Sequence, residues 1–166
     1  MKSLNECIQK YKEQMERGDI QKAYKGLMEF MLNLRNNLAD KYPVYSTSGN
    51  LYFGYMDMTY FSFTPEELKN KKLKIAIVFL HDKISFEVWL AGANKGIQSK
   101  YWKLFKDTGW NKYHIPESIV GIDSIIESEL CPNPDFDNLH LLAKQIEKGT
   151  LKFINDIISF LSKNQE

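Results

Sequence analysis

The chain has 166 residues, a length typical of one globular domain, so we expect a single domain over residues 1–166. Its 22 basic and 21 acidic residues leave a net charge of +1, which excludes an overall positive field that would attract nucleic acid or an anionic membrane. Hydrophobic residues make up 43% and charged residues 26%, as in an ordinary globular protein, whereas aromatic residues are somewhat abundant at 13%.

Two amphipathic helices open the chain. Ser3 and Glu6 form a capping box, and apolar residues then recur at helical spacing. Gly18 ends the first helix and Asp19 can cap the second, whose helical period continues to about Asp40. The sequence therefore predicts an N-terminal αα-hairpin with a very short connection.

An aromatic segment follows, with the sequence LYFGYMDMTYFSF at residues 51–63. Its aromatic and threonine content favours a strand, and its apolar residues lie on both faces. The sequence TPEE at residues 64–67 then predicts the start of a short helix, with Thr64 as the cap.

Residues 73–105 are the most informative part of the chain. Residues 73–80 form a nearly continuous apolar run, which is typical of an interior strand. A polar turn follows at 81–83, and apolar residues then alternate through 84–91, which predicts an antiparallel hairpin. Asn94 can cap a helix that lies across these strands. The residues of that helix predicted to face the sheet are Ile97, Tyr101, Leu104 and Phe105.

The sequence of the remaining third of the chain predicts a loop at 110–117, a strand at 118–131 and a long C-terminal helix. Gly149 lies within that helix and is expected to lower its stability by about 1 kcal/mol relative to alanine. The order of elements predicts an α+β fold. It comprises an about four-stranded, mostly antiparallel or mixed sheet packed by the N-terminal αα-hairpin, a central helix and the C-terminal helix.

Two resemblances accompany this pattern. The segments FEVWLAGANKGIQSKYW and PNPDFDNLHLLAKQIEKGTLKFINDIISFL resemble the bacterial family called domain of unknown function 7000. That resemblance extends over nearly the whole chain and implies a small cytosolic protein, but it implies no activity, because the family has none assigned.

The second resemblance concerns element order alone, which is similar to the core of the restriction-endonuclease-like fold. Those nucleases hold a divalent metal with an Asp on one strand and a Glu-x-Lys on the next. Asp57 and Glu87 match the acids, whereas Trp89 stands at the lysine position. The departure removes a cation that such sites use near the attacking water, and a shared fold is weak evidence for function.

Asp57 and Glu87 are the only acids within their predicted strands. If they meet on one sheet face, with Asn94, Gln98 or Lys100 nearby, they could bind a metal or act as acid and base. The alternative is that each carboxylate points to solvent or pairs with a lysine. Carboxylates within about 5 Å of each other would favour the first interpretation, since one cation must reach both.

The aromatic residues form a second candidate. They could line a pocket or groove for a planar ligand or a partner protein, or they could simply fill the core. Trp102 lies beside the predicted apolar stripe of its helix, so we expect it to be exposed. The residues concerned are Tyr52, Tyr55, Tyr60, Trp89, Tyr101, Trp102 and Trp110.

A lysine-rich helix face is a third candidate. It could bind phosphate or be a solvated surface. The start of the helix at Asn94 could hold an anion or be an ordinary capped end, and its spacing is not that of a phosphate loop. The face is formed by Lys95, Ser99, Lys103 and Lys106, with Lys100 toward one side.

Histidines and cysteines point to no further site. His81, His114 and His140 lack metal-binding spacing, so we expect neither a metal nor a cofactor. Cys7 and Cys131 are predicted to be reduced packing residues of a cytosolic protein. The N-terminal residues lack the apolar region of a signal peptide, and no apolar run reaches the ~18 residues of a membrane span. We therefore expect a cytoplasmic location.

No motif in the sequence specifies an activity. We expect a small non-catalytic module that binds a small molecule or a protein through an aromatic-lined site, and neither membranes nor nucleic acids are expected partners. The alternatives are a degenerate metal-dependent hydrolase or nuclease-like enzyme that uses Asp57 and Glu87, and a protein that homodimerises through its terminal helices. The predicted binding residues are Tyr55, Asp57, Glu87, Trp89, Asn94, Gln98 and Trp102.

Overall fold

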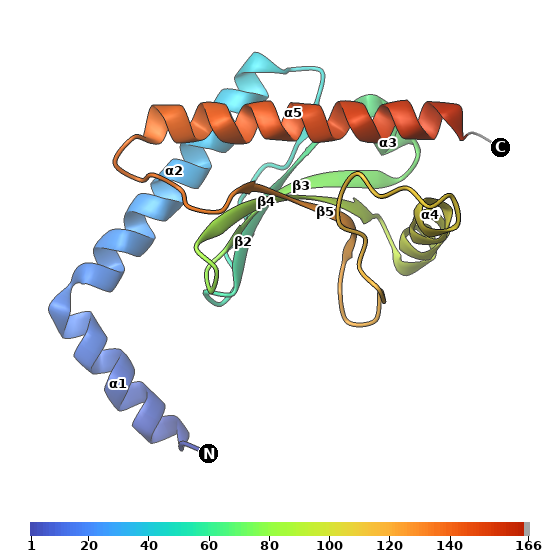
Figure 1. Ribbon diagram of the computed structural model, residues 1–166. Helices are drawn as coiled ribbons and strands as arrows, with labels where there is room; N and C mark the ends of the chain where they lie inside the picture. The colour runs from blue at the N-terminus through green and yellow to red at the C-terminus, as the bar shows by residue number, and fades with distance from the viewer. Residues whose placement is uncertain (165–166) are drawn as a thin grey trace. The chain divides into compact units, whose positions relative to one another are not determined.

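The computed structural model describes residues 1–164 and divides into two compact units, residues 1–34 and the residues from Arg35 onward (Figure 1). The division runs within a helix, and each unit is described by itself. The fold is α+β, as predicted, whereas the extension of one domain over residues 1–166 stays a prediction.

The first unit contains α1 (Leu4–Arg17) and most of α2 (Asp19–Lys41). The predicted capping box is present, because the Ser3 hydroxyl accepts a hydrogen bond from the Glu6 amide and the Glu6 carboxylate accepts one from the Ser3 amide. Gly18 ends α1 with a left-handed φ of 79°, which glycine adopts without strain. Asp19 is the first residue of α2 rather than its cap.

The described residues of the second unit form an antiparallel sheet of five strands, which lie side by side in the order of the sequence. The prediction of about four strands omitted β1, a two-residue strand within a segment that reads as polar and turn-rich, and every strand pair among the described residues is antiparallel. The strands are β1 (Ser46–Thr47), β2 (Met58–Thr64), β3 (Leu73–Leu80), β4 (Ser85–Gly92) and β5 (Ser124–Cys131).

The first long strand is shorter than predicted. Residues 51–57 form a loop, and of these Tyr52 bridges to Tyr60 of β2. Gly54 has a φ of 65°, and a Cβ at this position would collide with the Met58 carbonyl and the Asp57 carboxylate. Residues 51–57 therefore form a tight turn although their aromatic composition favoured a strand. As a result, Asp57 lies before β2 rather than within it.

The predicted hairpin of residues 73–91 is confirmed as β3 and β4, which pair from Leu73 with Gly92 to Leu80 with Ser85. α4 (Lys95–Asp107) follows directly, and its buried residues are Gln98, Tyr101 and Phe105. Ile97 and Leu104, also predicted to face the sheet, are only partly buried. α3 (Glu66–Asn70) is also not capped by Thr64, whose hydroxyl instead accepts a hydrogen bond from the Ile75 amide.

β5 begins at Ser124 rather than at residue 118, and its register with β4 shifts twice. The shift between Phe86 and Glu87 of β4 leaves Leu130 as an extra residue in β5. A Cβ on Gly149 of α5 (Leu139–Lys163) would lie 2.6 Å from Leu130 Cδ2. The glycine predicted to weaken the helix is therefore the point at which the helix approaches the bulged strand.

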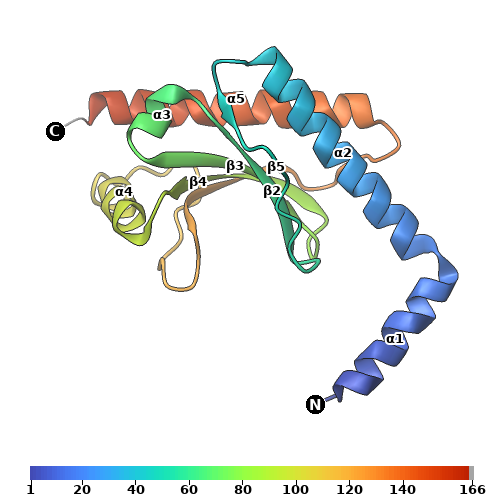
Figure 2. The same cartoon turned by 180° about the vertical axis from the view of Figure 1, so that it is seen from behind.

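The two faces of the sheet differ in what covers them. α5 runs across one face, as the opposite views of Figures 1 and 2 show. The side chains of that face are almost fully buried and form the core. They include Thr59, Phe61 and Phe63 of β2, Ile75, Ile77 and Phe79 of β3, Phe86, Val88 and Leu90 of β4 and Ile126 of β5.

Candidate functional site: the open face of the sheet

The face of β2–β5 opposite α5, which we call the open face, carries an ordered set of aromatic and acidic side chains. Residues that lie opposite each other in antiparallel strands point to the same side of a sheet, so the register defines rows across it. One row contains a stacked aromatic pair and two carboxylates. It reads Tyr52, Tyr60, Val78, Glu87 and Glu129.

The neighbouring row has small side chains beside a large one. Ala76 of β3 lies between Ser62 and Trp89, and Glu127 of β5 lies opposite Trp89 on the other side. Ser62, Ala76, Trp89 and Glu127 are all partly exposed. The open face therefore presents partly exposed aromatic rings next to small residues and carboxylates.

Tyr52 and Tyr60 form the aromatic part of the first row. Their rings are stacked, with centroids 4.8 Å apart. Burial raises the pKa of the Tyr60 hydroxyl, and Tyr52 and Asp123 raise it further. The hydroxyl therefore stays protonated at neutral pH and can donate a hydrogen bond.

Trp89 is held in place by a neighbour on its own strand. Its Nε1 donates a hydrogen bond of 2.6 Å to Glu87 Oε2, and the other oxygen of Glu87 lies 3.6 Å from Lys83 Nζ. Glu87 is only 7% exposed, so its carboxylate is shielded from water as well as paired. Such a charge-assisted bond restrains the orientation of the indole.

The structure does not bring Asp57 and Glu87 together. Asp57 lies three residues before Tyr60, and β2 is separated from β4 by β3. Strand spacing and rise place the two Cα atoms on the order of 14 Å apart. Asp57 instead stabilises its turn: hydrogen bonds from backbone amides, first that of Tyr55, lower the pKa of its carboxyl group.

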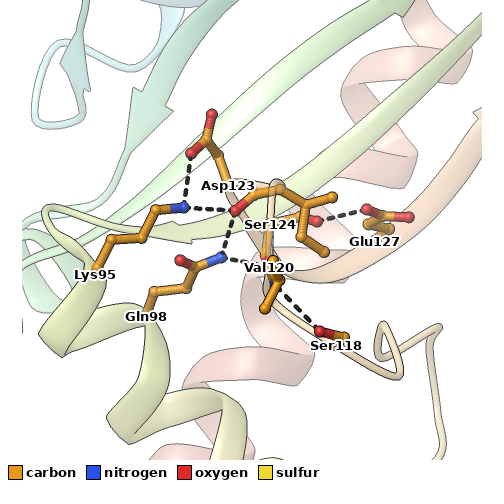
Figure 3. A network of polar contacts seen from close by, with 8 residues as sticks. Lys95, Gln98, Ser118, Val120, Asp123, Ser124 and Glu127 are labelled. Carbon is orange, nitrogen blue, oxygen red and sulfur yellow. Dashed lines mark hydrogen bonds and ion pairs between the residues drawn. The ribbon is translucent and has the colours of Figure 1, made fainter.

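Asn94 and Gln98 have structural partners. The Asn94 side chain accepts a hydrogen bond from the Ile97 amide and so caps α4, as predicted. Gln98 is buried, and its Nε2 donates to the carbonyls of Ile122 and Ser124 (Figure 3). Together with Lys95, which contacts Asp123, these bonds attach α4 to the segment that enters β5.

Trp102 and Tyr55 are not among the strand residues of the open face. Trp102 Nε1 donates to the Pro116 carbonyl at 2.8 Å, and Lys106 Nζ lies 4.8 Å from its ring centroid. Tyr55 is 94% exposed in the loop before β2. Within the described part of the chain, no hydrogen bond or ring contact joins Trp102 to Trp89, so the predicted set divides into separate places.

The sequence reasoning missed the contribution of β5. Glu127 and Glu129 join the open face only because β5 pairs with β4, a strand 30 or more residues away along the chain. Tyr52 and Tyr60 were among the candidate aromatic residues but not among the predicted binding residues. The period-two spacing of Met58, Tyr60 and Ser62 was the available signal for Tyr60, and it became usable once β2 was known to begin at Met58. Tyr52 joins the face only through its bridge to Tyr60.

Metal and thiol chemistry receive no support from the described residues. No group of three or more His, Cys, Asp or Glu side chains within residues 1–164 is arranged to hold a metal ion. Cys131 is buried, as predicted for a packing residue, but Cys7 is exposed on α1. Both thiols are free.

Comparison with known proteins agrees with the first resemblance. A model of the family described as "Domain of unknown function (DUF7000)" matches residues 4–161. The chain belongs to this family. Neither a curated protein nor a solved structure matches the chain. The described helices include none with the length and apolar character needed to cross a membrane.

Proposed function

We propose that this member of the DUF7000 family is a non-catalytic binding module of the bacterial cytoplasm, and that its ligand lies on the open face of the sheet. One observation carries the proposal: the strand register aligns Tyr60, Glu87 and Trp89 on the face that α5 does not cover. Val78 and Glu87 of this face are buried, whereas Tyr60 and Trp89 stay partly exposed and so are not used up in filling the core.

The chemistry of the open face favours a planar or apolar ligand that also carries hydrogen-bond donors or a positive charge. Aromatic rings supply apolar area together with polar tips, and a cation is attracted to their faces. Glu127 and Glu129 of β5 add more accessible carboxylates on the same side of the sheet. A small molecule or an extended protein segment with these properties is the expected ligand.

No specific observation favours the alternative hypothesis, a metal-dependent enzyme that uses Asp57 and Glu87. Its two proposed ligands are separated by β3, and Asp57 is engaged by backbone amides in a turn. The hydrogen bond from Trp89 occupies one oxygen of Glu87. A joint catalytic role for these two residues would require a rearrangement of the turn that holds Asp57 and of the bond between Trp89 and Glu87.

The proposal can be tested by ligand screening followed by NMR of the three tryptophan indoles. Compounds that raise the melting temperature are selected first, because a ligand held by the folded state stabilises it. With ¹⁵N-labelled tryptophan, we expect the selected ligands to shift the Trp89 indole resonance and to leave that of Trp102 nearly unchanged. Trp102 belongs to α4 rather than to a strand, and its indole is held by the Pro116 carbonyl.

Two tyrosine variants provide the matched comparison. Tyr60→Ala removes a ring from the open face, whereas Tyr55→Ala removes a fully solvated ring from the adjoining loop. We expect the first change to weaken binding about tenfold or more, as for the loss of a contacting aromatic side chain, and the second to leave it unchanged. Equal effects of both variants, or ligands that move the Trp102 signal alone, would contradict the proposal.

A further inference from the structure

A separate cavity lies in the second unit, away from the open face. It has a volume of about 400 Å³ and is formed by the turn between α3 and β3, one side of α4 and the last turns of α5. Its lining combines positive charge with apolar and aromatic surface. The lining residues are Lys71, Lys100, Tyr101, Lys103, Leu104, Asp107, Leu161 and Asn164.

The lysines of α4 fall into two groups that differ in their contacts. Lys95 pairs with Asp123, and Lys106 bonds to the Glu117 carbonyl, so both are engaged in holding the chain together. Lys100 and Lys103 instead line the cavity. Lys71 joins them from the turn before β3, which lies about 30 residues earlier in the sequence.

The three cavity lysines have no carboxylate partner among the residues that the structure describes. No ion pair joins Lys71, Lys100 or Lys103 to an acidic side chain there, and Asp107 is the one carboxylate in the lining. Three positive charges in the lining of one cavity attract an anion. The cavity is therefore suited to a negatively charged ligand.

The rest of the lining indicates what the anion is attached to. Tyr101 is 8% exposed, and Lys100 Nζ lies 5.4 Å from its ring centroid. Burial raises the pKa of the Tyr101 hydroxyl, so it remains a donor at neutral pH. Leu104 and Leu161 add apolar surface. An ion without an organic part would leave this surface unused.

We propose that this cavity binds a small phosphorylated organic molecule. Its phosphate contacts Lys71, Lys100 and Lys103, and its organic part lies against Tyr101 and Leu104. A phosphate monoester carries close to two negative charges and three acceptor oxygens, which matches three ammonium groups better than a single carboxylate does. The proposal is independent of the ligand on the open face, because the two sites share no residue.

Isothermal titration with three probes tests the proposal: phenyl phosphate, inorganic phosphate and phenol. We expect phenyl phosphate to bind more tightly than inorganic phosphate, and phenol not to bind. Affinity should fall as salt is added, because exposed charges are screened. Equal affinity for both phosphates would overturn the role of the apolar lining, and binding of phenol as tight as that of phenyl phosphate would overturn the role of the lysines.

Charge-removing variants locate the site. Lys100→Gln and Lys103→Gln should each weaken phenyl phosphate binding about tenfold, since a charged hydrogen bond is lost. Lys22→Gln removes the same charge from an exposed position in α2 and serves as the matched control. Lys100 and Lys103 are both exposed, so the fold of their variants should persist, as circular dichroism can confirm. An unchanged affinity in the Lys100→Gln, Lys103→Gln double variant, or an equal loss in Lys22→Gln, would overturn the proposal.

Discussion

At the residue scale, the bond between Trp89 and Glu87 determines how the central ring of the open face is held. Both residues lie on β4, two positions apart, so their side chains point to the same side of the strand. The Glu87 carboxylate is nearly buried, and it accepts the hydrogen bond of the Trp89 indole nitrogen. Position and pairing together give Trp89 one preferred orientation.

We predict that Glu87→Ala lowers the free energy of unfolding by about 1–3 kcal/mol, because it leaves the Trp89 N–H without its acceptor. Glu87→Gln keeps an acceptor oxygen and should lose less. Urea denaturation measures both changes. Glu129→Ala is the control: this exposed carboxylate lies opposite Glu87, and removing it relieves repulsion, so stability should change by less than about 0.5 kcal/mol. A larger loss for Glu129→Ala than for Glu87→Ala would contradict the interpretation.

At the element scale, α4 is attached to the sheet at its first turn. The Asn94 cap and the Gln98 bonds to Ile122 and Ser124 lie beside Gly92, where β4 ends. A Cβ at Gly92 would lie 2.6 Å from the backbone nitrogen of Gln98. The passage from strand to helix therefore requires a residue without a side chain.

Gly92→Ala should destabilise the protein by about 1–3 kcal/mol, because backbone atoms cannot move aside as the end of a side chain can. Gly26→Ala is the matched control within α2: no atom lies within 4 Å of its added Cβ, and alanine should stabilise the helix by up to about 1 kcal/mol. Thermal denaturation compares the two variants. The idea fails if both substitutions change the melting temperature in the same direction.

A second attachment joins the loop after α4 to α5. Asp156 of α5 accepts hydrogen bonds from Lys112, Lys152 and Tyr113. Burial alone would raise the pKa of the Asp156 carboxyl group, but these three donors and the charge of Lys112 outweigh it and hold the pKa well below its usual range. The folded state therefore binds the proton at Asp156 less readily than the unfolded state does.

This difference predicts a dependence of stability on pH. Since the pKa is lower in the folded state, the contribution of Asp156 is complete above the ordinary carboxyl pKa of about 4 and is lost progressively as the pH falls below it. Asp156→Asn should lower stability at pH 7 and flatten the acid limb of the curve, as urea titrations between pH 2 and 7 can show. Asp40→Asn, at an exposed position of α2, should leave that limb unchanged.

At the scale of the whole second unit, stability should be greatest in the middle of the sheet. β3 and β4 are hydrogen-bonded to a strand on both sides, and their core-facing side chains are buried beneath α5. β1 has two residues and lies at an edge, and residues 51–57 form a loop. Opening of the interior strands therefore requires the loss of far more contacts.

We predict that the amides of β3 and β4 exchange with deuterium most slowly, near the rate set by global unfolding, whereas those of residues 46–57 exchange much faster. Hydrogen exchange followed by NMR provides the rates. Protection of β1 equal to that of β3 would show that the edge is covered by something other than the described residues of this chain.

Much of the element order could be predicted from short-range patterns. The capping box at Ser3, the glycine after α1, the Asn94 cap and the β3–β4 hairpin were all recognised correctly. Each depends on interactions between residues a few positions apart, so the local sequence contains the information. The errors at residues 51–57 and 118–123 occurred where composition favoured a strand but a positive-φ glycine made a turn.

The sites depended on contacts that no local pattern contains. The open face acquires Glu127 and Glu129 from the register of β5 with β4, and the cavity unites Lys71 with Lys100 and Lys103 from a different element. A shift of one residue in register would turn every side chain of a strand to the other face. Composition and periodicity reveal which residues are available, whereas the packing of distant segments selects those that meet, because burial and strand pairing act on the folded chain as a whole.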